Sequence, residues 1–149
     1  MKATACMIGV FVALTFGRSL QAEFSVGTWV QTAPMKSLTM TVEECCNGGR
    51  RLTFHVPVGP KSQTITVESR FDGSDAPVLV DSKPNGETMA LKRVDARRTT
   101  TVFKRGGKVY RTSTALESTD GKTLTVENEF VDTANGHVTG KMTETYARK

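Results

Sequence analysis

The residues most able to do acid–base or metal chemistry are the two histidines, His55 and His137. Histidine is the usual general base and the commonest metal ligand near neutral pH. Each histidine falls on the polar phase of the segment that contains it, opposite the apolar residues. Because that phase faces solvent in a half-buried strand, both side chains are expected to be exposed, and neither is predicted to be catalytic.

The adjacent cysteines Cys45 and Cys46 are the second feature with chemical potential. Neighbouring residues on a strand point to opposite faces, and a bridge between them is geometrically demanding. Free thiols, a rare adjacent-residue disulfide and an intermolecular link all remain open. Two thiols without a histidine near them in the sequence make a poor zinc site, so no metal is predicted.

Other motifs fall short of a catalytic or cofactor site. The Gly-Gly-Lys of Arg105-Gly106-Gly107-Lys108 lacks the full spacing of a phosphate-binding loop. The adjacent Glu43 and Glu44 point to opposite faces of a strand, so they are not a paired acid and base. The sequence therefore predicts a protein that is not an enzyme and that needs no cofactor.

Residues 1–22 are typical of an export signal. Lys2 precedes an apolar run from Ala5 to Phe16, and Ala22 supplies a small residue at the cleavage position. The run of about 12 residues is too short to cross a bilayer core, which takes roughly 20. We therefore expect an exported bacterial protein, periplasmic or secreted, with a single domain at 23–149 and no transmembrane segment after cleavage.

The elements expected in that domain are short antiparallel strands. Leu52, Phe54 and Val56 alternate with polar residues, and period-two alternation is typical of a sheet packed on one face. Residues 123–131 show the same pattern, and no stretch has a convincing helical period. Turn signals separate these segments, at Asn47-Gly48-Gly49, Asp72-Gly73, Pro84-Asn85-Gly86, Arg105-Gly106-Gly107, Asp120-Gly121 and Asn135-Gly136.

A basic segment offers a possible interaction surface. Eight lysines or arginines lie between residues 92 and 111, against the single acid Asp95. Such asymmetry can attract anionic partners, although it is also compatible with the solvated face of a hairpin. The expected partners are an anionic envelope surface or a protein, and export argues against nucleic acid. The candidate surface residues are Arg93, Arg97, Arg98, Lys104, Arg105 and Lys108.

The opening Gly27-Thr28-Trp29, followed by meandering strands, resembles the lipocalin and fatty-acid-binding group of barrels, the calycins. The segments 71–73, 89–95, 104–109 and 120–126 and the ending 144–148 resemble small exported bacterial lipocalin-like proteins of unassigned function. The resemblance implies an all-β, antiparallel up-and-down barrel of eight to ten strands that encloses a cavity for a small molecule. It also implies that Arg148, on the last strand, packs against Trp29.

These observations predict a non-enzymatic binding protein that holds a small amphipathic or anionic molecule inside the barrel. One face of the segment 108–118 carries Tyr110, Thr112, Thr114 and Leu116. The other face carries Val109, Arg111, Ser113, Ala115 and Glu117. A single bulge would exchange inside and outside. If phenylalanines and Met142 fill the interior, no cavity remains. The residues predicted to bind the ligand are Trp29, Tyr110, Thr112, Thr114, Asn128, Tyr146 and Arg148.

Overall fold

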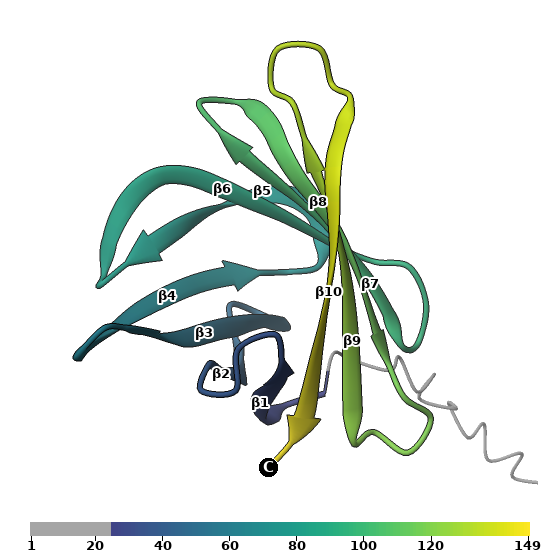
Figure 1. Cartoon of the computed structure of the whole chain (residues 1–149). Helices are drawn as coiled ribbons and strands as arrows, with labels where there is room; N and C mark the ends of the chain where they lie inside the picture. Colours follow the sequence, from purple (N-terminus) through teal and green to yellow (C-terminus); the bar gives the residue numbers. More distant parts are fainter. Residues whose placement is uncertain (1–24) are drawn as a thin grey trace, which may run out of the picture.

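The computed structural model describes residues 25–149, so the predicted signal at 1–22 lies outside the described residues. The described part forms ten strands, all antiparallel to their neighbours, that close into one barrel (Figure 1). The strands are β1 (Gly27–Ala33), β2 (Thr39–Cys45), β3 (Gly49–Val58), β4 (Lys61–Ser69), β5 (Asp72–Val80), β6 (Lys83–Arg93), β7 (Arg98–Arg105), β8 (Lys108–Glu117), β9 (Thr123–Val131) and β10 (Val138–Arg148).

Each strand pairs with the next in the sequence, and β1 closes the barrel by pairing with β10. This is the up-and-down order, and it confirms the predicted fold class. Closure removes the exposed edges that an open sheet would present. Within residues 25–149 there is no helix, in agreement with the lack of a convincing helical period in the sequence.

The alternation read from the sequence places the core correctly. On β3, Leu52 is buried and pairs with Val42 and Val67, which are also buried. On β9, Leu124 is buried, whereas Thr123 and Glu127, on the other face of the strand, are exposed. The four largest fully buried side chains are Trp29, Leu124, Val42 and Val67.

Two of the predicted turns are wrong. The β5–β6 hairpin turns at Asp81 and Ser82, whose φ angles of 48° and 67° are left-handed, and Pro84 pairs with Leu79 inside the ladder. The β4–β5 connection lies at residues 70–71, so Gly73 belongs to β5. Gly73 and Gly86 were expected in turns, but both lie within the β5–β6 ladder. This ladder is irregular, since its pairing shifts register twice, and glycine tolerates the local distortion.

The ladder between β4 and β5 is much shorter than the others. These two strands pair only at Ile65–Val80 and Thr66–Leu79, whereas β3 and β4 are in register from Arg50–Ser69 to Val58–Lys61. We call this interrupted ladder the β4–β5 seam. It has the fewest paired residues of any ladder in the barrel.

Candidate functional site: a two-sided cavity in the barrel

The barrel encloses a cavity of about 290 Å³. The part of its wall from β2 to β5, with the residue just before β2, is wholly apolar, and its members are Leu38, Met40, Leu52, Phe54, Val56, Ile65 and Val78. All the polar side chains that line the cavity come from β6 to β10, and they are Asn85, Glu87, Thr99, Thr101, Tyr110, Arg111, Ser113, Asn128, Glu144 and Tyr146. The cavity therefore has one apolar wall and a second, mixed wall, called here the polar wall, in which these polar side chains lie among Met89, Leu91, Phe103, Ala115, Leu124 and Val126.

Arg111 is the cation of the polar wall. Its guanidinium lies over the ring of Phe103, with Cζ 3.6 Å from the ring centroid, and its Nε is buried without a hydrogen-bond partner. Within residues 25–149 Arg111 forms no ion pair. Arg111 as a whole is half-buried. Because a buried donor without a partner is costly, an anion that enters the cavity would gain from contact with this side chain.

A bulge on β8 places Arg111 in the cavity. Phe103 pairs with Arg111 but Lys104 pairs with Val109, so Tyr110 is an extra residue in the ladder. As a result both Tyr110 and Arg111 face the cavity. From Arg111 onward the inward residues are those with odd numbers, such as Ser113 and Ala115.

Tyr110 belongs to a polar cluster with Glu87 and Arg105. The Tyr110 hydroxyl donates to Glu87 Oε2 at 3.2 Å, and Arg105 Nε donates to Glu87 Oε1 at 2.9 Å. Burial would raise the pKa of Glu87, but hydrogen bonds from Arg105, Asn85 and Tyr110 outweigh burial and lower that pKa. The carboxylate of Glu87 is therefore ionised, and Arg105 and Tyr110 already bind it.

A second polar chain crosses from β1 to β10. Gln31 Nε2 donates to the Tyr146 hydroxyl at 3.3 Å, and this hydroxyl donates to Glu144 Oε2 at 2.8 Å. Burial, followed by the charge of Glu144, raises the pKa of Tyr146. Tyr146 thus stays a neutral phenol, and it presents a fixed hydroxyl to the cavity.

The predicted lining residues divide into three groups. Tyr110, Asn128 and Tyr146 do line the cavity. The prediction that Thr112 and Thr114 line it is wrong: after the bulge they fall on the other face of β8, where they border a polar hollow. Arg111, Glu87 and Glu144 were not among the predicted site residues. Arg111 was assigned to the face opposite the lining residues, and Glu87 follows a segment that was expected to be a turn.

Trp29 and Arg148 lie together beside the start of β1, and neither lines the cavity. Trp29 is completely buried, and Arg148 Cζ lies 5.7 Å from its ring centroid, which confirms the predicted contact. Arg148 Nη2 also donates to the Val26 carbonyl at 2.6 Å. A Cβ on Gly27 would lie 3.1 Å from Arg148 Nε. The glycine of the Gly-x-Trp pattern therefore makes room for the arginine that covers the tryptophan.

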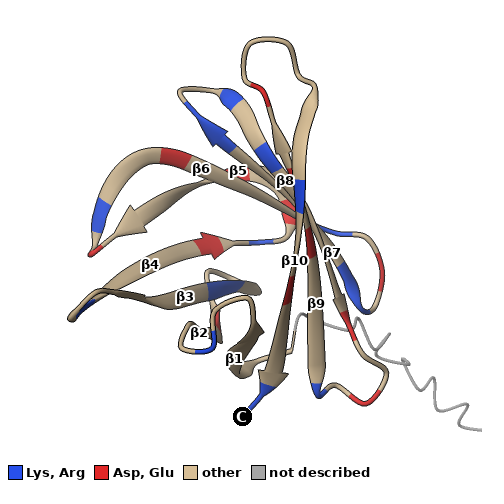
Figure 2. Ribbon diagram, in the orientation of Figure 1, with Lys and Arg blue, Asp and Glu red and all other residues tan. Residues whose placement is uncertain are grey.

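The basic residues predicted to form one surface are divided between the two ends of β7 (Figure 2). Arg93, Arg97 and Arg98 lie at the β6–β7 turn, and the other three candidates lie at the β7–β8 turn. Several are paired locally: Lys104 with Asp75 at 2.9 Å, Arg105 with Glu87, and Arg98 with Asp95 at 3.9 Å. These ion pairs partly neutralise the positive charge of the basic residues.

The part of the chain that the structure describes has no helix long and apolar enough to span a bilayer. Comparison with protein families found no family that matches the chain, and comparisons with curated proteins and with solved structures found no match either.

Proposed function

We propose that this chain is an exported, non-enzymatic binding protein that carries a small amphipathic anion in its barrel. The proposal includes membership of a lipocalin-like group and bacterial export, for which the Gly27-Thr28-Trp29 opening and the signal at residues 1–22 are the support. The closed up-and-down barrel is consistent with a calycin-type fold. A cavity within a barrel is a common place for one small ligand.

The observation that carries the proposal is the position of Arg111 opposite an apolar wall. A guanidinium that lacks an ion pair within residues 25–149 and stacks on Phe103 favours an anionic group. Facing it, Phe54, Ile65 and Val78 favour a hydrocarbon or aromatic body. At about 290 Å³, the cavity is at the small end of the usual range of roughly 300–1,000 Å³. A short-chain carboxylate fits this description better than a long fatty acid.

The test uses a pair of ligands that differ only in charge, octanoate and octanol. Each is titrated against the protein in the presence of an anionic naphthalene dye that fluoresces in apolar sites, and displacement of the dye is measured. We expect octanoate to bind at least about tenfold more tightly, because a hydrogen bond to a charged group contributes about 1.5–3 kcal/mol. Equal displacement by the two ligands would contradict the proposed role of Arg111.

Native mass spectrometry of the protein isolated from a bacterial periplasm provides an independent test. A reproducible extra mass that is lost on denaturation supports a cavity ligand. If octanoate does not bind and the isolated protein carries no extra mass, a surface interaction becomes the better explanation. In that case binding to anionic vesicles should weaken with added salt and with charge reversal at Arg97 and Arg98, two residues at the β6–β7 turn.

A further inference from the structure

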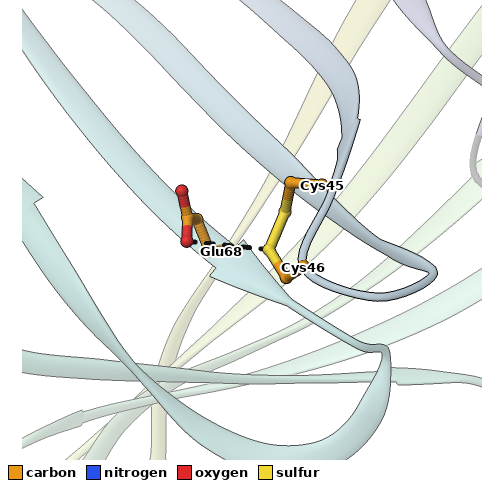
Figure 3. A group of neighbouring side chains, drawn as sticks. All are labelled: Cys45, Cys46 and Glu68. Carbon is orange, nitrogen blue, oxygen red and sulfur yellow. Dashed lines mark hydrogen bonds between the residues drawn. A yellow bond between two sulfur atoms is a disulfide. The ribbon is translucent and has the colours of Figure 1, made fainter.

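Cys45 and Cys46 form a disulfide between adjacent residues at the β2–β3 turn (Figure 3). Both residues are half-buried rather than enclosed. The turn continues through Cys46 and Asn47, whose φ angles of 49° and 51° are left-handed. The sulfur pair is therefore accessible from the surface, at a place remote in sequence from the polar wall of the cavity.

Glu68, near the end of β4, holds its carboxylate against the sulfurs. Arg51 binds one oxygen of this carboxylate, Oε1, through Nε at 2.8 Å and Nη2 at 2.6 Å. The other oxygen, Oε2, lies 3.6 Å from Cys46 Sγ. Because a disulfide sulfur has no hydrogen to donate, this oxygen gains no hydrogen bond from Cys46 in the oxidised protein. Arg51 thus holds the carboxylate of Glu68 in place, with Oε2 directed at the sulfurs.

The two sulfurs and a carboxylate oxygen of Glu68 lie within 4.8 Å of one another. Two thiolates and a carboxylate, with water in the fourth position, are a suitable ligand set for Zn²⁺. The adjacent cysteines alone predict no such site, because the third ligand comes from another strand. Pairing of Arg51 with Glu68 across β3 and β4 brings that ligand to the turn.

We propose that the Cys45–Cys46 bridge closes a metal site that opens on reduction. A dithiol reductant transfers two electrons and two protons to the bridge, breaks the S–S bond and is itself oxidised to a disulfide. Zn²⁺ then binds the two sulfurs and Glu68 Oε2, and each thiol releases its proton to solvent. A disulfide oxidant then accepts two electrons from the two thiolates and two protons from solvent and leaves as a dithiol. This step re-forms the S–S bond and releases the metal, so the affinity for Zn²⁺ depends on the redox state.

The test measures Zn²⁺ binding by calorimetry and by metal content per chain, using Zn²⁺ alone as the probe. Every sample carries Cys6→Ser, so that Cys45 and Cys46 are the cysteines present. Reduced and oxidised proteins are compared without oxygen. The key variant is Glu68→Gln, and the matched control is Glu43→Gln, which removes an exposed carboxylate of β2 outside the cluster. Circular dichroism verifies that each variant is folded.

We expect one Zn²⁺ per reduced chain and none per oxidised chain. Glu68→Gln should weaken binding at least about tenfold, since even partners outside the ligand shell contribute 10–100-fold. Glu43→Gln should leave the affinity unchanged. Equal binding by the oxidised protein, no binding by the reduced protein, or equal affinities in the two glutamine variants would each overturn the proposal.

Discussion

Replacing Arg111 with methionine should separate ligand affinity from stability. Methionine keeps the length and the apolar stem of the side chain and removes the charge. In the present structure the guanidinium forms no ion pair within residues 25–149, and its Nε lacks a hydrogen-bond partner. Its main contact is the face of Phe103 at 3.6 Å. Binding and folding therefore depend on different properties of this one side chain.

The expected loss of affinity follows from the charged hydrogen bonds that the ligand would lose. These hydrogen bonds contribute about 1.5–3 kcal/mol, and each ~1.4 kcal/mol corresponds to a tenfold change in affinity. Octanoate should therefore bind roughly 10- to 150-fold more weakly. Octanol, which has no charge to lose, should bind with its original affinity. Isothermal titration of both ligands measures the ratio directly.

The stability of the same variant should change little. Loss of the stacking on Phe103 costs about 0.5–2 kcal/mol, and removal of the unsatisfied Nε returns about 1–3 kcal/mol. These terms nearly cancel, so the free energy of unfolding in urea should stay within about 2 kcal/mol of the parent protein. Arg98→Met, at the β6–β7 turn, is the control. Retained octanoate binding in Arg111→Met, or equal weakening in both variants, would refute the role given to Arg111.

Three further predictions concern the residues that support the cavity. Gly27→Ala should lower the melting temperature more than Gly59→Ala, because a Cβ at Gly27 meets Arg148 whereas Gly59 has open space; a reversed order would contradict the role given to Gly27. Tyr146→Phe should cost about 1–3 kcal/mol in urea unfolding, since Glu144 and Gln31 lose a buried partner; no change would mean that water replaces the hydroxyl. The pKa of Glu87 is lowered in the folded protein. The ionised carboxylate therefore stabilises the fold fully above the unfolded pKa, near 4.5, and this stabilisation disappears as the pH falls through the lower folded pKa. Glu87→Gln should therefore flatten the acid limb of a stability–pH curve, and an unchanged limb would assign acid sensitivity to other groups.

Much of the fold could be predicted because alternation is a local signal. Leu52, Phe54 and Val56 share a face in the sequence and in the barrel, and the turn at Gly106 and Gly107 stands where glycine pairs are expected. The turn at Asp81 and Ser82 was not predicted, because no glycine marks it. Aspartate and serine can occupy the left-handed region at moderate cost, and the nearby Pro84-Asn85-Gly86 gave a stronger but misleading signal.

The cavity was harder to predict because one bulge decides which side chains enter it. Up to Tyr110 the predicted face of β8 is correct, and beyond it the extra residue exchanges the faces. A bulge depends on how β7 and β8 pair, which is a non-local property. One signal was available: Leu116 was the only apolar residue on the face assigned to the cavity beyond Tyr110, and it is exposed in the barrel. Small Ser113 and Ala115 on the other face were compatible with an inward position.

The β4–β5 seam has a kinetic consequence. Only two residue pairs join β4 to β5, so local opening of this ladder should require less free energy than opening a long ladder such as that of β9 and β10. Ile65 and Val78, which lie on these two strands, also line the cavity. A ligand could then enter and leave through the side of the barrel without unfolding it. In that case the residence time of the ligand follows the opening rate of this seam, and the ligand should slow amide exchange in β4 and β5 more than in β9 and β10.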